Sequence, residues 1–203
     1  MLRPETADPA PRSQIVVYGA RADEPAARIR ANVGAFCRPA LPRAGAWDAI
    51  ANASMALLEV AFPERGSQVV LAPVLRSGLA MLDVARRHFG GPTIWPVVAT
   101  RAMLKSGTSP EFLRTADARG DMVLILDPIV ATGATLLSVI SELQRETARM
   151  AVCCCYAAPE GLQRIAAAFP AVTIHVGVLA EGVDSTGYLV PATHGDAGDK
   201  LFR

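Results

Sequence analysis

The chain has 203 residues, the length of one domain, which leaves little room for two. Apolar residues make up 51% of it and charged residues only 19%, so disorder is excluded for most of its length. Lys and Arg total 20 against 19 for Asp and Glu, a net charge of +1, and no long basic run appears. This balance disfavours nucleic acids and anionic membranes as partners.

Residues 1–13 are rich in Pro and predict a flexible tail, and residues 14–203 predict a single domain. An apolar run at 15–18 precedes two helical patterns, at 24–37 and 47–62. Further on, continuous apolar runs alternate with amphipathic helical patterns. The runs span 68–72, 93–99, 122–126, 150–157 and 172–179, and the helical patterns span 79–89, 134–147 and 161–169. This alternation predicts an α/β fold with an open, mainly parallel sheet of about five strands and helices on both faces.

No apolar run reaches the length of about 20 residues that spans a bilayer, and the N-terminus has no apolar segment of the signal-peptide type. We therefore expect a soluble, cytoplasmic protein. Cys153, Cys154 and Cys155 are consecutive, and neighbouring residues of a strand point to opposite faces, so they are poorly placed to pair or to chelate a metal together. We interpret them as core residues, with Cys37 too distant to complete a metal pattern.

Two segments interrupt the alternation. Residues 101–120 form a polar stretch of about 20 residues containing Gly and Pro, a length typical of a lid or a binding loop in a compact domain. Residues 182–199 form a second stretch that is dense in Gly and Asp.

The segment MVLILDPIVATGAT, residues 122–135, predicts a phosphate site. An apolar strand ends at Asp127, and a Thr- and Gly-containing loop then leads into a helix. Ligands of open α/β sheets bind at the carboxyl ends of strands, and the amides of a helix N-terminus attract anions. We expect Asp127 to accept hydrogen bonds from sugar hydroxyls. The residues expected around the phosphate are Ala131, Thr132, Gly133, Ala134 and Thr135. The alternative is an ordinary strand end followed by a turn.

Two other nucleotide sites are disfavoured, because the chain lacks both the Gly-Lys-Ser/Thr of a Walker loop and a Gly-x-Gly-x-x-Gly after a strand.

Three segments resemble motifs of the uracil phosphoribosyltransferases, which have the type I phosphoribosyltransferase fold. DPIVATGAT, residues 127–135, resembles the family's DPMLATGG followed by Ser or Thr, and LAPVLRSGLAM, residues 71–81, resembles its PILRAGLGM. GYLVPATHGDAGDKLF, residues 187–202, is similar to its GYIVPGLGDAGDRLF. The resemblance covers roughly residues 68–203. It implies Mg²⁺-dependent transfer of ribose 5-phosphate from 5-phosphoribosyl diphosphate to uracil, giving UMP and pyrophosphate (pyrimidine salvage), in a homodimer or higher homo-oligomer.

The resemblance also implies roles around the leaving group. Arg76 would bind pyrophosphate oxygens, for which a guanidinium is suited, although taken alone it reads as a solvated surface arginine. Arg101 stands where the family carries a second pyrophosphate-binding arginine, whereas Lys105 is expected to be solvated. Residues 101–120 would form a flexible hood, with Glu111 and Phe112 as its candidate functional residues.

The resemblance places Asp196 near the ribose diphosphate, where it would bind Mg²⁺, directly or through water, or contact the substrate. Arg76, Arg101 and Asp196 are thus the implied catalytic residues. Asp199 would hold the loop. The residues implied at the base are Leu189, His194 and Gly195.

The base segment departs from the family pattern. Ala192-Thr193-His194 stands where the family has Gly-Leu, so the segment is one residue longer, and the N-terminal portion lacks the family's long helical arm. The altered segment leaves open a different heteroaromatic acceptor, and His194 is either a donor to it or an exposed loop residue. A non-catalytic ligand sensor on the same fold is a third interpretation, disfavoured by the motif residues retained at 76, 127 and 132–135. His88 and His175 are interpreted as structural.

Overall fold

The computed structural model describes residues 15–64, 69–99, 103, 106–113, 122–145, 149–193 and 197–202. The strands are β1 (Ile15–Val17), β2 (Val69–Leu75), β3 (Thr93–Ile94), β4 (Val97–Val98), β5 (Glu111–Phe112), β6 (Met122–Leu126), β7 (Ile129–Val130), β8 (Met150–Ala157), β9 (Thr173–Leu179), β10 (Gly182–Val183) and β11 (Leu189–Val190). The helices are α1 (Glu24–Phe36), α2 (Arg43–Ala61), α3 (Leu79–His88), α5 (Ala134–Leu143), α6 (Pro159–Ala168) and α7 (Ala197–Phe202). The predicted N-terminal tail lies outside the described residues.

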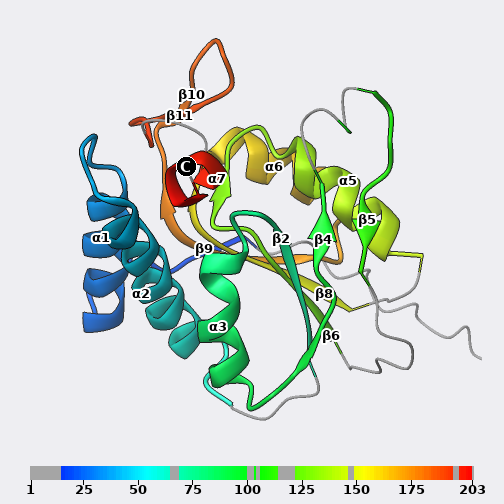
Figure 1. The fold of residues 1–203 in the computed structure, drawn as a ribbon, viewed down its shortest axis with the longest axis horizontal. Coiled ribbons are helices and arrows are strands. Elements are labelled where there is room, and N and C mark those ends of the chain that lie inside the picture. The colour runs from blue at the N-terminus through cyan, green and yellow to red at the C-terminus, as the bar shows by residue number, and fades with distance from the viewer. Residues whose placement is uncertain are drawn as a thin grey trace, which may run out of the picture.

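The described strands form one large sheet and a separate β10–β11 hairpin (Figure 1). The order in the sheet is β1-β9-β8-β6-β2-β4-β5, with β3 also paired to β2 and β7 to β8. Its pairs are parallel except β4 with β5. The predicted open, mainly parallel α/β sheet is therefore confirmed. It has more strands than the five expected, because β1 and β5 add short pieces at the two edges, β7 pairs with β8, and the strand expected at 93–99 is divided in two.

The strand expected at 93–99 is divided into β3 and β4. Both pair with β2, and Trp95 and Pro96 lie between them. The Trp95 amide still donates to the Leu71 carbonyl at 2.8 Å, but proline has no amide to donate to the ladder. In the stretch at 101–120, residues 111–112 form β5, antiparallel to β4, although no strand was predicted there. A two-residue strand is too short for any periodicity to show in the sequence.

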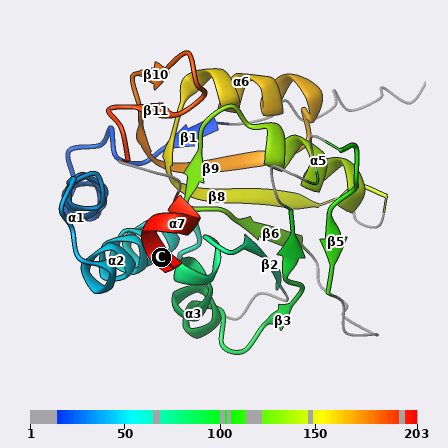
Figure 2. The ribbon, with the colours of Figure 1, turned by 45° about the horizontal axis from the view of Figure 1, so that its top comes forward.

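Helices cover both faces of the sheet (Figure 2). One core cluster joins α1, α2, α3 and α7 to one face, and a second joins α5 and α6 to the other. Alternating residues of β2 divide between them: Leu71 belongs to the first cluster, while Val70 and Ala72 belong to the second. Because both faces are buried, the central strands read as continuous apolar runs in the sequence.

Two helix boundaries differ from the sequence pattern. Helix α2 begins at Arg43, four residues before the apolar spacing becomes visible, because Pro42 immediately precedes its first turn and Ala46 is already buried. Helix α5 ends at Leu143, whereas the pattern ran to 147.

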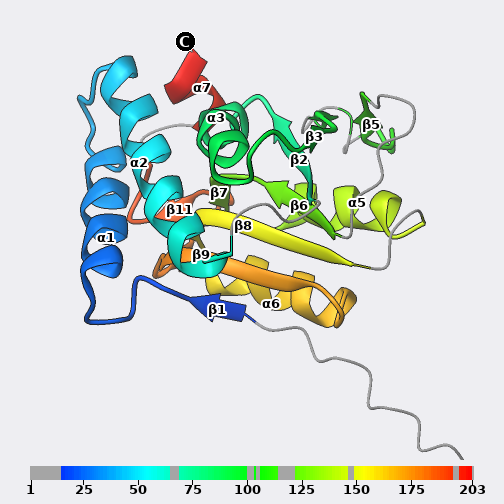
Figure 3. The same cartoon turned by 90° about the horizontal axis from the view of Figure 1, so that it is seen from below.

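Figure 3 shows α1 and α2 side by side at one end of the molecule. No helix among the described residues combines the length and apolar character needed to cross a membrane.

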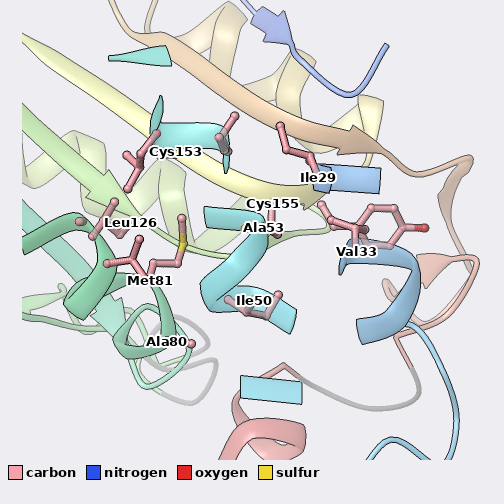
Figure 4. Packing of buried hydrophobic residues seen from close by; sticks show 14 of the residues in the cluster. Ile29, Val33, Ile50, Ala53, Ala80, Met81, Leu126, Cys153 and Cys155 are labelled. Carbon is pink, nitrogen blue, oxygen red and sulfur yellow. The ribbon is translucent and has the colours of Figure 1, made fainter. Parts of the chain in front are cut away.

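The consecutive cysteines lie in β8, in the middle of the sheet. Cys153 and Cys155 point into the cluster beneath α1–α3 (Figure 4), and Cys154 points into the opposite cluster. All three are fully buried and free, and burial raises the pKa of the Cys155 thiol to about 12. Their interpretation as core residues is confirmed.

Both described histidines have local structural partners. The buried ring of His175 in β9 shares a 3.0 Å hydrogen bond with the Tyr18 hydroxyl, and burial lowers its pKa to about 4. His88, at the end of α3, contacts the Phe62 carbonyl through Nε2 at 2.8 Å. The structural interpretation of these two residues is confirmed.

Candidate functional site

The chain changes its direction of travel across the sheet between β2 and β6. From β2 it passes through α3 to β4 on one side, and from β6 it passes through α5 to β8 on the other. Strands β2 and β6 are parallel neighbours, so their carboxyl ends lie at the same edge. Such a point is where open α/β sheets bind ligands. The fold thereby brings the two sequence motifs, at 71–81 and 122–135, together.

Asp127 follows β6 at this edge and is only 7% exposed. Its amide donates to the Cys153 carbonyl at 3.2 Å, which continues the pairing of β6 with β8. Its Oδ1 accepts a hydrogen bond from Ser77 Oγ at 3.3 Å, across the strand ends. A buried carboxylate needs such donors to offset its lost hydration. Ser77 is a site residue that the sequence analysis missed; the available signal was its place beside Arg76 in the motif.

The turn after β2 packs closely on the strand ends. A Cβ added at Gly78 would lie 2.5 Å from the Leu126 carbonyl oxygen and 2.6 Å from the Val74 amide nitrogen, so only glycine fits. The Gly78 amide donates to the Val74 carbonyl at 2.8 Å, and the Leu75–Arg76 peptide bond is cis. This turn holds Ser77 against Asp127 and carries Arg76 at the edge of the site.

The predicted phosphate loop ends where α5 begins. Gly133, at φ +76°, is the N-cap of the helix, and its carbonyl accepts the first helical hydrogen bond, from the Leu137 amide at 2.9 Å. The amides in the first turn of a helix have no intrahelical acceptor, and they carry its positive dipole end. The Ala134 amide approaches Thr132 Oγ1 at 3.5 Å. This arrangement is suited to a phosphate group.

The first half of α6 packs closely against the predicted phosphate loop. A Cβ added at Gly161 would lie 2.1 Å from the Ala131 carbonyl oxygen and 3.0 Å from the Gly133 nitrogen. Arg164 Nη1 donates to the Thr132 carbonyl at 2.6 Å. The sequence pattern predicted Gly161 only as the first residue of a helix. The available signal of a closer role was a glycine in a helical pattern, where alanine would be the better helix former.

Arg76 is paired with the C-terminal helix. Its Nη2 lies 3.1 Å from Oδ1 of Asp199 in α7, and its guanidinium lies 5.6 Å from the centre of the Phe202 ring. The two charged side chains are 51% and 41% exposed, so the ion pair contributes little stability and can exchange for another anion. The carboxylate of Asp199, expected to hold the loop, thus connects α7 to the turn after β2.

The β10–β11 hairpin approaches the phosphate loop. A Cβ added at Gly187 would lie 3.2 Å from Thr132 Cγ2, and Leu189 in β11 is buried. Asp184 organises the hairpin turn: its carboxylate accepts hydrogen bonds from the Thr186 hydroxyl and from the Thr186 and Tyr188 amides, and these bonds lower its pKa. The predicted base-binding residue Leu189 therefore belongs to a segment adjacent to the predicted phosphate site.

The segment after β11 is anchored by the sheet. The Tyr156 hydroxyl, at the end of β8, donates to the Pro191 carbonyl at 3.1 Å, and the Val190–Pro191 peptide bond is cis. Burial raises the pKa of Tyr156 to about 12, so the hydroxyl stays protonated as a donor. Tyr156 was not predicted as a residue of this site, because nothing in a strand pattern marks a residue that contacts a loop 35 positions away.

Several predicted site residues lie outside the described part of the structure: Arg101, Lys105, His194, Gly195 and Asp196. The structure brings four of the predicted site elements to one edge of the sheet: Arg76, Asp127, Leu189 and the loop at 131–135. Glu111 and Phe112 of the predicted hood lie in β5, at the sheet margin. Among the described residues, no three His, Cys, Asp or Glu side chains are close enough to hold a metal ion.

The chain matches a family model and is similar to several solved structures. The family model described as uracil phosphoribosyltransferase matches residues 58–203, well over half of the chain. The AQ2163 protein from Aquifex aeolicus has a similar fold: the TM-score is 0.78 at 24% identity, covering 93% of this chain and 98% of that one. Two more distant structures are orotate phosphoribosyltransferase from Aeropyrum pernix, with a TM-score of 0.46 at 17% identity over 62% and 68%, and xanthine-guanine-hypoxanthine phosphoribosyltransferase from Helicobacter pylori, with 0.47 at 17% over 64% and 81%.

Proposed function

The chain belongs to the uracil phosphoribosyltransferase family, and we propose that it transfers ribose 5-phosphate from 5-phosphoribosyl diphosphate to uracil. The bond between the ribose C1 and the pyrophosphate oxygen breaks, a bond from C1 to a ring nitrogen of the base forms, and that nitrogen loses its proton. The products are UMP and pyrophosphate. The observation that carries the proposal is the meeting of Asp127, Ser77 and the loop at 131–135 at the switch point of the sheet.

The donor would lie along the edge formed by β2 and β6. Its 5-phosphate would accept hydrogen bonds from the amides at the start of α5, with the Thr132 and Thr135 hydroxyls beside them. The Asp127 carboxylate, already oriented by Ser77, would accept hydrogen bonds from the ribose hydroxyls. The rigid support of the loop by Gly161 favours this assignment, since a site formed before binding costs little ordering.

Arg76 would neutralise the departing pyrophosphate. Charge accumulates on this group as C1 becomes oxocarbenium-like, and a guanidinium can bind two of its oxygens at once. Because the Arg76–Asp199 pair is largely solvated, a pyrophosphate with several negative charges would displace the single carboxylate. Arg101 is proposed as the second cationic residue at this position.

Mg²⁺ is proposed to accompany the donor. The described residues offer no carboxylate cluster of their own, but Mg²⁺ commonly keeps several waters and binds substrate phosphates with only one or two protein carboxylates. A diphosphate with Asp196 beside it fits this pattern. Bound there, Mg²⁺ would supply positive charge to the pyrophosphate.

One observation favours a second acceptor. The base segment carries Ala192-Thr193-His194, one residue longer than the family motif it resembles, and main-chain groups of this segment would contact the base. A different heteroaromatic base with the same leaving-group chemistry is therefore the second candidate.

Assaying pyrophosphate release with a panel of bases, Mg²⁺ and the donor distinguishes these candidates. We expect uracil to exceed other pyrimidines and pyridines by at least about tenfold in kcat/KM, since a lost base hydrogen bond costs at least this much. A higher kcat/KM for another base would replace uracil as the acceptor. Tight donor binding without turnover of any base would instead indicate a ligand sensor.

Replacing Asp127 with asparagine is expected to weaken donor binding about tenfold or more, because hydrogen bonds to a charged acceptor contribute about 1.5–3 kcal/mol. The change is nearly isosteric, so the Ser77 contact and the fold should survive. Calorimetric titration with 5-phosphoribosyl diphosphate measures the effect. Asp83→Asn is the matched control, because Asp83 is an exposed carboxylate of α3 that pairs with Arg86 and Arg87 on the same helix. Equal affinities of the two variants would remove Asp127 from the ribose site.

A further inference from the structure

Three backbone carbonyl oxygens converge on the Lys200 ammonium in α7. Nζ donates to the carbonyls of Arg38 at 2.9 Å and Thr193 at 3.0 Å, and also to the carbonyl of Phe36. An ammonium group has three N–H donors and no acceptor, so these three bonds account for its whole capacity. Lys200 is half-buried, and this burial lowers its pKa.

The Phe36 carbonyl belongs to the last residue of α1, and Arg38 follows two residues later. The last turn of α1 contains no basic residue. Carbonyls at a helix C-terminus carry partial negative charge and are stabilised by a cation. Lys200 supplies that cation from 164 positions further along the chain. Residue 200 lies inside the span that matches the family and α1 lies outside it, so this contact joins the two parts.

The third carbonyl belongs to the segment proposed to contact the base. Thr193 is buried, and Lys200 holds its carbonyl, while the Tyr156 hydroxyl holds the carbonyl of Pro191 two residues earlier. Ala192 lies between these two anchors and is exposed. The backbone at 191–193 is thus fixed on both sides by side chains that come from β8 and α7.

One of these anchors, the contact of Lys200 with Thr193, coincides with departures from the family motif. Thr193 belongs to the longer segment, and Lys200 stands where the similar motif GDAGDRLF has arginine. A cationic donor is therefore retained at this position, and in this chain it contacts the altered segment directly.

We propose that Lys200 and Tyr156 are positioning residues for the acceptor, which hold the backbone at 191–193 in the shape that receives the base and tie that shape to the end of α1. The inference rests on the proposed function, since it assigns this segment to the acceptor. Neither side chain contacts Asp127 or the loop at 131–135 through these hydrogen bonds, so we expect donor binding to be affected less than acceptor binding.

Steady-state kinetics of Lys200→Met and Tyr156→Phe test the proposal. We expect Lys200→Met to raise KM for the base by about tenfold or more and Tyr156→Phe to raise it by about three- to tenfold, in line with charged and neutral hydrogen bonds. The KM for 5-phosphoribosyl diphosphate and kcat should each change by less than about threefold. Lys200→Arg, which restores a cationic donor, should recover most of the acceptor KM.

Two control variants remove comparable groups elsewhere. Arg145→Met deletes an exposed cation that follows α5 and pairs with Glu142. Tyr18→Phe deletes a buried hydroxyl that bonds His175 and not the loop. Both should leave the acceptor KM unchanged. An unchanged acceptor KM in Lys200→Met, or an equal rise in both substrate KM values, would overturn the proposal.

Amide hydrogen exchange of the unliganded protein separates this proposal from the proposed function. Exchange at residues 189–193 should be at least about tenfold faster in Lys200→Met than in the wild-type protein, while exchange in α5 should not change. This result with no turnover of any base would retain the anchored segment and reject the transferase reaction. Unchanged exchange at 189–193 would reject the anchoring itself.

Discussion

Replacing Arg76 with alanine is expected to lower kcat by about 100- to 1,000-fold, the loss found when a group that stabilises transition-state charge is removed. The guanidinium is half exposed and its ion pair with Asp199 is solvated, so its removal should cost little stability. Pyrophosphate release at saturating donor and base measures the effect. The donor KM should rise less than kcat falls, because charge on the leaving group is largest in the transition state.

Arg87→Ala provides the matched control for this prediction. Arg87 is an exposed arginine of α3 whose Nη1 lies 2.5 Å from Oδ2 of Asp83, so its removal deletes a similar surface ion pair from the neighbouring helix. Its kcat should stay within about twofold of the wild-type value, because surface pairs contribute at most about 1 kcal/mol. If Arg76→Ala retained wild-type turnover, the leaving-group role of Arg76 would have to be abandoned.

Replacing Gly161 with alanine is expected to disturb the phosphate loop more than any substitution within the loop's own hydroxyls. The new Cβ would lie 2.1 Å from the Ala131 carbonyl oxygen, so loop and helix must separate. Overpacking of this kind costs about 1–3 kcal/mol. We expect that loss in urea unfolding, together with donor binding weakened by at least about tenfold, since the amides of α5 and the carboxylate of Asp127 would no longer keep their relative positions.

Gly34→Ala tests whether this effect is local. Gly34 lies within α1, and a Cβ there meets nothing within 4 Å, so alanine should stabilise the protein by up to about 1 kcal/mol through helix propensity. Donor affinity should not change in this variant. Wild-type donor affinity in Gly161→Ala would show that the loop at 131–133 does not bind the phosphate.

The strand end and the helix start on either side of the proposed phosphate loop could be predicted because the signals for them are local. Strand β6 ends at the predicted residue, and α5 starts at the predicted residue, since an apolar run, a glycine and the start of a helical pattern fall within 14 neighbouring positions. The glycine has the positive φ that such a turn favours. The continuous apolar strands likewise predicted burial on both faces, which the two core clusters confirm. Short-range patterning records the local backbone and its burial, and both were legible here.

The contacts that turn these elements into a site were not predictable in the same way. Ser77 meets Asp127 across 50 positions, Arg76 meets Asp199 across 123, and Lys200 meets the end of α1 across 164. The edge strand β5 was missed for a related reason: two residues show no period, and only pairing with β4 makes them a strand.

By itself, the sequence determined the α/β class, the parallel core and the strand–loop–helix segment for which a phosphate is proposed, because periodicity and turn residues act over a few neighbouring positions. Only the tertiary structure decided which distant groups meet: α6 packs against that loop, Ser77 donates to Asp127, and Lys200 donates to the carbonyls of Phe36 and Thr193. These contacts depend on which distant segments the sheet order brings side by side. A hydrogen bond or a close approach of two backbones leaves almost no trace in the residues adjacent to either partner.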